Sequence, residues 1–204
     1  MIESLPDYMF NRQDDSPDEI FYSIPRMVNH IDAATIRNIT EFYSEKLSEQ
    51  DELLDLMSSW VSHLPDSTPY KRVTGLGMNY EELKANPQLD EAVVQNLNVT
   101  PILPFPNASF NAVMIVVSVQ YLTKPFDVFK EISRVLKLGG QCIVAMSHRL
   151  FPSKAIYAFQ ALGPQERVKF VQNYMIEAGF KEIEFLDRSP KGADPLWIVR
   201  GLNA

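Results

Sequence analysis

Four side chains have the chemistry to act on a small molecule. The most polar cluster at the end of any predicted strand is residues 147–149, and its centre, His148, titrates near neutral pH and is a candidate base for an oxygen or nitrogen nucleophile. Tyr121, after an earlier strand, either orients a substrate through its phenol or packs at the rim of a site. Near the N-terminus, Arg26 and His30 interrupt apolar segments, and an arginine binds a carboxylate or phosphate through paired hydrogen bonds. The alternatives are a solvated His148 and an Arg26 paired with a surface acid.

Composition and charge narrow the kinds of partner. The chain has 204 residues, 46% of them apolar, so it is long enough to bury a core in one domain. Its net charge of -7 and pI near 5.0 predict no binding to nucleic acid or to an anionic membrane, which leaves a small molecule or another protein as partner. The single cysteine, Cys142, excludes an internal disulfide and a cysteine-based metal site, and no metal site is predicted.

The sequence also predicts where the protein works. No stretch approaches the roughly 18 apolar residues of a membrane span. Residues 1–30 carry several acids and lack the apolar centre of a signal peptide. We therefore expect a cytoplasmic protein.

Hydrophobic periodicity predicts strands and helices in alternation. Asp32 and Asn79 are candidate N-caps, and the first ten residues are expected to be poorly ordered. The expected strands are residues 53–56, 71–76, 93–97, 112–119, 141–147, 181–186 and 196–199. The expected helices lie within 21–47, in a brief segment ending at Leu64, after Asn79, from Pro125 to a Gly-Gly stop at 139–140, and from Pro164 to Ala178.

One stretch of the chain is distinctive in its order of motifs. It begins with Leu103-Pro104-Phe105-Pro106 and Ser109-Phe110-Asn111, which precede an apolar strand. A helix follows that closes on Arg134-Val135-Leu136-Lys137-Leu138-Gly139-Gly140, and a second strand comes after it, so the stretch makes one βαβ unit. This order resembles the back half of class I S-adenosylmethionine-dependent methyltransferases, most closely the type-11, UbiE-like group, and the resemblance covers roughly residues 50–187. It implies a Rossmann-like, mostly parallel seven-stranded sheet with an antiparallel last strand and helices on both faces.

The resemblance also implies a division of the chain and a set of cofactor-binding positions. Residues 1–50 are expected to form an N-terminal tail and helical lid, and residues 51–204 a single α/β domain. S-adenosylmethionine is expected to bind at the strand ends, where the family's motif positions correspond to Asp55, Ser58, Ser59, Gly77, Met78, Asn96, Leu97 and Ser118.

This sequence departs from the family pattern at three of those strand ends. No glycine follows the first strand, Gly77 stands where the family has a ribose-binding acid, and Asn96 replaces an aspartate. Asn79 or Glu81 are the candidate substitutes for the missing acid. An amide such as that of Asn96 can still accept a hydrogen bond from an adenine amino group.

Two functions remain open. The first is methyl transfer from S-adenosylmethionine to a small-molecule acceptor, with Arg26 and His30 in the lid facing the acceptor. The alternative is a catalytically inactive, methyltransferase-like protein that serves as a binding or assembly factor with a protein partner. A nicotinamide dehydrogenase is excluded because the phosphate-binding turn is missing.

Overall fold

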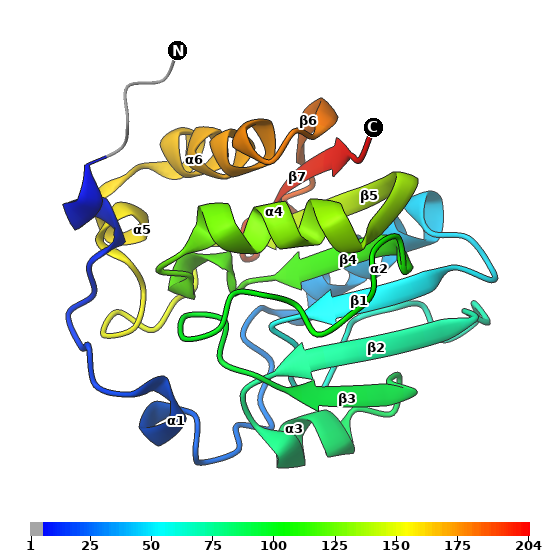
Figure 1. Ribbon diagram of the computed structural model, residues 1–204, viewed down its shortest axis with the longest axis horizontal. Helices are drawn as coiled ribbons and strands as arrows, with labels where there is room; N and C mark the ends of the chain where they lie inside the picture. The colour runs from blue at the N-terminus through cyan, green and yellow to red at the C-terminus, as the bar shows by residue number, and fades with distance from the viewer. Residues whose placement is uncertain (1–5) are drawn as a thin grey trace.

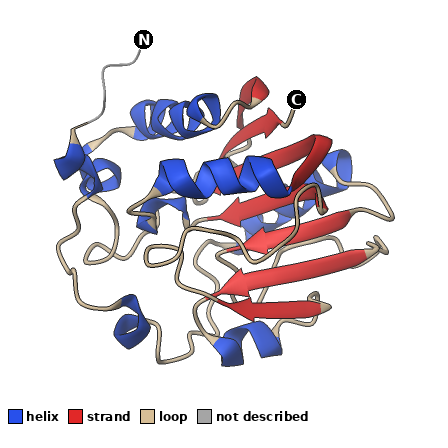
Figure 2. Ribbon diagram, viewed as in Figure 1, coloured by secondary structure: helices blue, strands red, loops and turns tan. Residues whose placement is uncertain are grey.

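A computed structural model describes residues 6–204, which build one mixed β-sheet covered by helices on both faces (Figures 1 and 2). The order of its strands is β3-β2-β1-β4-β5-β7-β6. Strands β1 to β5 pair in parallel, and β7 runs antiparallel to both of its neighbours, as predicted for the methyltransferase fold. The strands are β1 Glu52–Leu56, β2 Arg72–Gly77, β3 Glu91–Val94, β4 Phe110–Val116, β5 Leu136–Met146, β6 Lys181–Asp187 and β7 Trp197–Leu202.

The two faces of the sheet carry different helices. Helices α4 and α6 lie on the near face in Figure 1, and α2 lies behind the sheet. The longer helices are α2 Ala33–Lys46, α4 Pro125–Val135 and α6 Pro164–Glu177. The short ones are η1 Asp7–Phe10, α1 Asp18–Phe21, α3 Tyr80–Ala85, η2 Val119–Tyr121 and α5 Tyr157–Ala161.

Local sequence explains why the long helices form where they do. Asp32 caps α2 because its carboxylate accepts hydrogen bonds from the N–H groups of Ala34 and Thr35, both at 2.9 Å. Pro125 occupies the first turn of α4, where it has no N–H to leave unpaired. Four buried side chains then recur along one face of α4, at Val128, Phe129, Ile132 and Val135.

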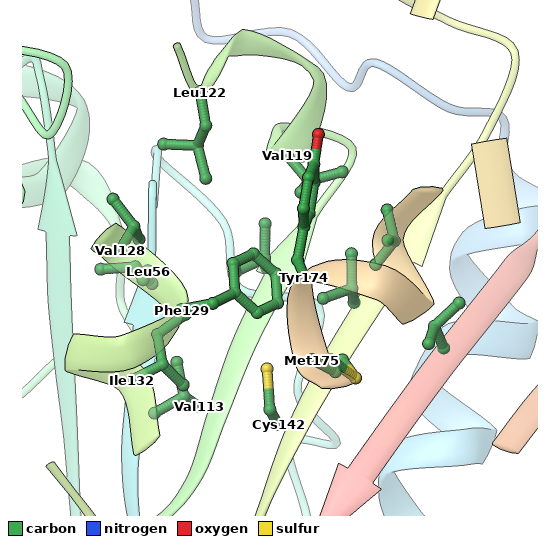
Figure 3. Packing of buried hydrophobic residues seen from close by; sticks show 14 of the residues in the cluster. Leu56, Val113, Val119, Leu122, Val128, Phe129, Ile132, Cys142, Tyr174 and Met175 are labelled. Carbon is green, nitrogen blue, oxygen red and sulfur yellow. The ribbon is translucent and has the colours of Figure 1, made fainter. Parts of the chain in front are cut away.

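The larger hydrophobic core lies between α4, α6 and the sheet. Figure 3 shows Phe129 of α4 beside Tyr174 of α6, whose ring centroids are 5.4 Å apart, over Val113 and Cys142 of the central strands. A second core of 13 buried residues packs α2 against the opposite face of the sheet. The central strands are therefore apolar on both faces, as expected for parallel strands covered on both sides.

Several predicted boundaries were wrong. The segment between β1 and β2 contains no helix, so the helix expected to end at Leu64 is absent. Within the expected helical stretch 21–47, residues 22–32 are not helical, and α2 begins at Ala33. Helix α4 ends at Val135, and the Gly-Gly pair lies inside β5. The pairing of β5 with β4 is irregular at this pair. Glycine suits both positions, because Gly139 has a φ of +76° and a Cβ on Gly140 would lie 2.8 Å from the carbonyl oxygen of Lys137. Strand β3 begins two residues earlier than predicted, at Glu91, and ends at Val94; β4 also begins earlier, at Phe110, and ends at Val116.

The N-terminal segment crosses the sheet at the carboxyl ends of the parallel strands (Figure 1, dark blue). The prediction of poor order falls partly on residues 1–5, which lie outside the described residues, but Asp7–Phe10 forms a 3-10 turn. The ring of Phe10 lies 5.8 Å from Phe170 and 5.9 Å from Phe126. The segment is therefore packed against α4 and α6 before it reaches the strand ends.

Candidate functional site

A cavity of about 350 Å³ lies at the carboxyl ends of β1, β2 and β4. It lies where the strand order turns from β1 to β4, the place where open α/β sheets bind ligands. Residues 18–30 of the N-terminal segment contribute one wall, and the loops after β1, β2, β3, β4 and β5 contribute the others. This volume falls within the range of small-molecule sites.

The structure gathers most of the predicted site residues around this cavity. Its lining includes Arg26, His30, Ser58, Ser59, Gly77, Met78, Asn96, Leu97, Ser118 and Tyr121. Asp55 lies beneath the loop and lines a neighbouring pocket of about 50 Å³. His148 is not among the residues that line either pocket; its side chain is 49% exposed and its Nε2 lies 3.4 Å from Oδ1 of Asp194.

The loop after β1 makes its turn without a glycine. Met57 takes a left-handed conformation with a φ of +62°, which costs more in methionine than in glycine. The N–H of Ser58 donates to the carbonyl oxygen of Leu76 at 2.8 Å, which draws the loop against the end of β2. A Cβ on Gly77 would lie 2.3 Å from the carbonyl oxygen of Ser58. The close approach that Gly77 permits is therefore an approach by the chain's own backbone.

Asp55 supports this loop from below. Its Oδ2 accepts hydrogen bonds from the hydroxyls of Ser58 at 2.6 Å and Ser62 at 2.7 Å. Burial raises the pKa of Asp55 to about 6, and the two hydroxyls oppose that shift. The carboxyl group thus holds the shape of the loop from a position outside the main cavity.

Glu82 is the acid at the end of β2, and it is neither of the candidates named from the sequence. It is 8% exposed and lines the cavity; its Oε1 accepts from the N–H of Arg26 at 2.7 Å and its Oε2 from the hydroxyl of Ser59 at 2.6 Å. Glu81 is exposed, and Asn79 is engaged in capping α3 and in donating to the carbonyl oxygen of Tyr22. Adjacent residues of a helix point about 100° apart. The two glutamates are neighbours in the sequence, and only the orientation of α3 decides that Glu82 and not Glu81 lines the cavity.

The loop after β3 also contacts the N-terminal segment. The amide of Asn96 donates to Oε1 of Glu19 at 2.8 Å, and its oxygen accepts from the N–H of Asn98 at 3.0 Å. Asn98, which the sequence did not single out, donates to Oδ2 of Asp18 and to the carbonyl oxygen of Tyr121, both at 3.0 Å. Leu97 is buried beside them.

Ser118 lines the cavity and has a polar atom without a partner. Its hydroxyl oxygen is buried and has no hydrogen-bond partner among residues 6–204. Its neighbour Val117 has a φ of +46°, a conformation that is strained for a β-branched residue. A buried hydroxyl without a partner is costly, so this position favours a ligand that supplies one.

Two ionisable groups of the lining differ in their readiness to move a proton. Partial desolvation is the main cause that lowers the pKa of His30, an exposed residue whose neutral imidazole can accept a proton. Burial raises the pKa of Tyr121, so its phenol stays protonated, and its oxygen accepts from the N–H of Phe151 at 2.9 Å. Of His30 and His148, which are both exposed, only His30 lines the cavity.

The described residues form neither a metal site nor a membrane-spanning helix. Within residues 6–204, no group of three or more His, Cys, Asp or Glu side chains is arranged to hold a metal ion. In the same part of the chain, no helix has the length and apolar character needed to cross a membrane.

Known proteins resemble this chain in sequence over the site and in structure over most of its length. The methyltransferase-domain family profile matches residues 57–144, a range that holds the loops after β1, β2, β3 and β4. No curated protein matches the chain significantly in sequence.

Three solved structures illustrate the likeness. The [4+2]-cyclase SpnF is 16% identical to this chain with a TM-score of 0.62, and the alignment covers 82% of this chain and 80% of the SpnF chain. Geranyl diphosphate C-methyltransferase from Streptomyces coelicolor, solved with Mg2+, geranyl diphosphate and S-adenosyl-L-homocysteine, is 16% identical with a TM-score of 0.58, over 82% of this chain and 80% of that one. A Haloferax volcanii methyltransferase structure with the Trm112 activator is 14% identical with a TM-score of 0.57, over 86% and 99%. This chain has the fold of the class I S-adenosylmethionine-dependent methyltransferases, and its residues 57–144 match the methyltransferase-domain profile.

Proposed function

We propose that this protein transfers a methyl group from S-adenosylmethionine to a small-molecule acceptor. The observation that carries the proposal is the cavity at the strand ends, because four of the five loops that line it from the sheet side, those after β1 to β4, lie within residues 57–144, which the methyltransferase-domain profile matches. The alternative of an inactive binding or assembly factor finds no support in the comparisons. We further propose that the protein acts in the cytoplasm.

The residues of the cavity fit an adenosyl cofactor. Ser118 has a buried hydroxyl that lacks a partner in the described chain and that a cofactor heteroatom would satisfy. Glu82 supplies a carboxylate at the end of β2 for the ribose hydroxyls, in place of the acid that Gly77 cannot provide. Asn96 and Leu97 would face the adenine ring, and the backbone beyond Met57 would face the methionine end.

The chain's own task is alignment and the exclusion of water. The bound cofactor supplies a methyl group that is already activated on a sulfonium. In the proposed division into a tail and lid (residues 1–50) and an α/β domain (residues 51–204), the part of the lid that lines the cavity is the segment before α2, and Glu82 ties that segment to the cofactor loops through Arg26 and Ser59. His30, neutral and on the lid side of the cavity, takes the proton that the acceptor's nucleophile loses.

Calorimetric titration with S-adenosylhomocysteine tests the site. Ser118→Ala is expected to weaken binding about fivefold, which corresponds to roughly 1 kcal/mol for one hydrogen bond. Ser147→Ala is the matched control, because Ser147 also has a buried hydroxyl without a partner within residues 6–204 but does not line the cavity. Its affinity should equal that of the wild type. No binding by the wild type, or equal losses in both variants, contradicts the proposed site.

Labelled S-adenosylmethionine tests the reaction itself. The wild-type protein is expected to label a small-molecule fraction of a cell extract, and Arg26→Ala with His30→Ala is expected to reduce that labelling more than cofactor binding. Cofactor binding without any labelled product would favour the inactive alternative.

A further inference from the structure

We propose that the methyl acceptor carries an anionic group, a carboxylate or a phosphate, and that Arg26 binds it. This inference rests on the proposed function, because it assigns one end of the same cavity to the acceptor. It names the substrate class that the reaction itself leaves open.

Arg26 is a cation in the cavity lining with spare donors. Its Nη2 donates to the carbonyl oxygen of Phe21 at 2.9 Å and its Nη1 to that of Ile24 at 3.3 Å, and no other hydrogen bond of its guanidinium is formed with residues 6–204. No carboxylate of that part of the chain lies within 4.0 Å of the guanidinium nitrogens. The remaining donors keep the fork geometry that suits a carboxylate or phosphate.

Of the other charged side chains that line the cavity, Asp18 and Arg149 are in ion pairs, and Glu82 is held by neutral donors. Arg149 pairs with Asp194 at 3.0 Å, and Asp18 pairs with Arg12 at 2.7 Å. The carboxylate of Glu82 accepts from the backbone N–H of Arg26 and from Ser59, at a distance from the guanidinium beyond ion-pair range. The charge of Arg26 is thus left for a ligand to match.

Neighbouring aromatic rings hold the guanidinium in place. Its carbon lies 4.4 Å from the ring centroid of Phe21 and 5.5 Å from that of Phe151. Contacts of this kind orient an arginine without neutralising it. The side chain is therefore positioned before an anion arrives, which lowers the entropy cost of binding one.

Its place in the cavity separates it from the proposed cofactor position over β1 to β3. Glu82, after β2, holds the backbone of Arg26, but the side chain reaches Phe151, which follows β5. Phe151 stacks on Tyr121, which follows β4, with centroids 5.8 Å apart. His30, the proposed base, lies 5.4 Å from Phe151, so base and anion subsite share the acceptor's end.

The chemistry of this end also describes the acceptor's body. Burial raises the pKa values of Tyr22 and Tyr121, so both phenols stay neutral and do not repel an anion. Together with Phe151 they offer aromatic surface to the cavity. A planar or apolar body that bears one anionic group fits such walls.

Binding of small probes tests the inference without any methyl transfer. Benzoate and phenyl phosphate are titrated in ligand-observed NMR, with benzamide as the neutral match to benzoate. The wild type is expected to bind both anions at least tenfold more tightly than benzamide, and Arg26→Gln to lose that preference. Arg26→Lys, which keeps the charge, should retain part of it, and Arg149→Gln should change it less than twofold. Equal binding by wild type and Arg26→Gln, or an equal loss in Arg149→Gln, overturns the proposal; near-ultraviolet circular dichroism checks that each variant is folded.

A second comparison separates the acceptor's anion from the methionine carboxylate of the cofactor. S-adenosylhomocysteine has that carboxylate, whereas 5′-deoxy-5′-methylthioadenosine lacks it. Arg26→Gln is expected to bind both within twofold of the wild type. A tenfold loss confined to S-adenosylhomocysteine would assign Arg26 to the cofactor and overturn the proposal. Failure of the wild type to bind either nucleoside, with Arg26-dependent binding of the anions intact, would instead reject the proposed function and keep the anion site.

Discussion

Gly77 lets two loops of the cavity meet, and its replacement should cost stability. A Cβ at this position would lie 2.3 Å from the carbonyl oxygen of Ser58, a backbone atom that is itself held by the bond from Ser58 to Leu76. We expect Gly77→Ala to lower the free energy of unfolding by about 1 to 3 kcal/mol, the usual cost of overpacking. Gly77→Asp places an acid where the family resemblance expects one, and it should lower stability in the same way. Because its Cβ pushes against a loop that lines the cavity, we expect it to weaken cofactor binding and not to strengthen it.

Urea unfolding measures this effect, with Gly163→Ser as the control. The Cβ of that control would meet only the flexible carboxylate of Glu166 at 3.3 Å, and serine is a good N-cap for α6. Its stability should stay within about 0.5 kcal/mol of the wild type. Equal unfolding midpoints for the Gly77 variants and the wild type would show that the two loops can move apart.

Asp55 should make stability depend on pH in a recognisable direction. Because burial raises its folded pKa to about 6, above the ordinary value of 3.8, the folded state holds this proton more tightly than the unfolded state. The contribution of Asp55 to stability is therefore highest below the unfolded pKa and falls as pH rises from about 4 to 6. The whole shift corresponds to about 3 kcal/mol.

Asp55→Asn isolates this contribution, since an amide oxygen can still accept from Ser58 and Ser62. We expect the variant to gain stability relative to the wild type as pH rises from 4 to 7, measured by urea unfolding at each pH. A difference that stays constant over this range would mean that Asp55 ionises normally in the folded protein.

At the scale of elements, a buried lysine fastens the N-terminal segment to the body. The side chain of Lys154 has 0% exposure, and its Nζ lies 2.7 Å from the carbonyl oxygen of Ser16, 3.1 Å from Oδ2 of Asp14 and 3.5 Å from Oδ1 of Asp18. Removing one member of a buried ion cluster leaves the others uncompensated. The path of residues 14–18 toward the cavity depends on this contact.

Lys154→Met is expected to lower the free energy of unfolding by about 3 to 5 kcal/mol. Hydrogen exchange should show faster exchange of the amides in residues 14–22 than in the strands, because the anchor acts locally first. Lys169→Met, at an exposed position of α6, should change neither quantity. Unaltered exchange in residues 14–22 of Lys154→Met would show that other contacts suffice to hold the segment.

At the scale of the whole molecule, the lid and the sheet should unfold together. The indole N–H of Trp60 donates to the carbonyl oxygen of Val28 in the N-terminal segment at 3.1 Å, whereas Trp197 begins β7 and pairs with Met146 of β5. The two tryptophans thus report on different parts of the structure. Contacts from Glu82, Asn96 and Lys154 join those parts across the cavity.

Trp60→Phe leaves Trp197 as the fluorescent reporter, and Trp197→Phe leaves Trp60. For each variant, the urea transition measured by tryptophan fluorescence is expected to match in shape and midpoint the transition measured by circular dichroism. An earlier fluorescence transition in Trp197→Phe, where Trp60 reports, would mean that the N-terminal segment opens as a separate unit.

The fold followed from the sequence because its signals are local. The spacing of apolar residues in α4, the proline at its first turn, the Asp32 cap of α2 and the βαβ order of residues 103–147 all act between near neighbours in the chain. These signals fixed the order of strands and helices, and with the family resemblance they gave the sheet topology. They failed after β1, where a brief helix ending at Leu64 was expected; the segment between β1 and β2 contains no helix, and the N–H of Ser58 bonds to Leu76 of β2 instead.

The sequence by itself also placed eight of the residues that line the cavity at strand ends, since parallel strands bring their carboxyl ends to one edge. It did not decide which side chain faces inward or which charges find partners. Three features follow from contacts between segments far apart in the chain. The cavity lining holds Glu82 and not Glu81, it holds His30 and not His148, and Arg26 has no carboxylate in ion-pair range among residues 6–204. Such contacts depend on the rotation of each helix and the path of each loop after packing, and no local pattern records them.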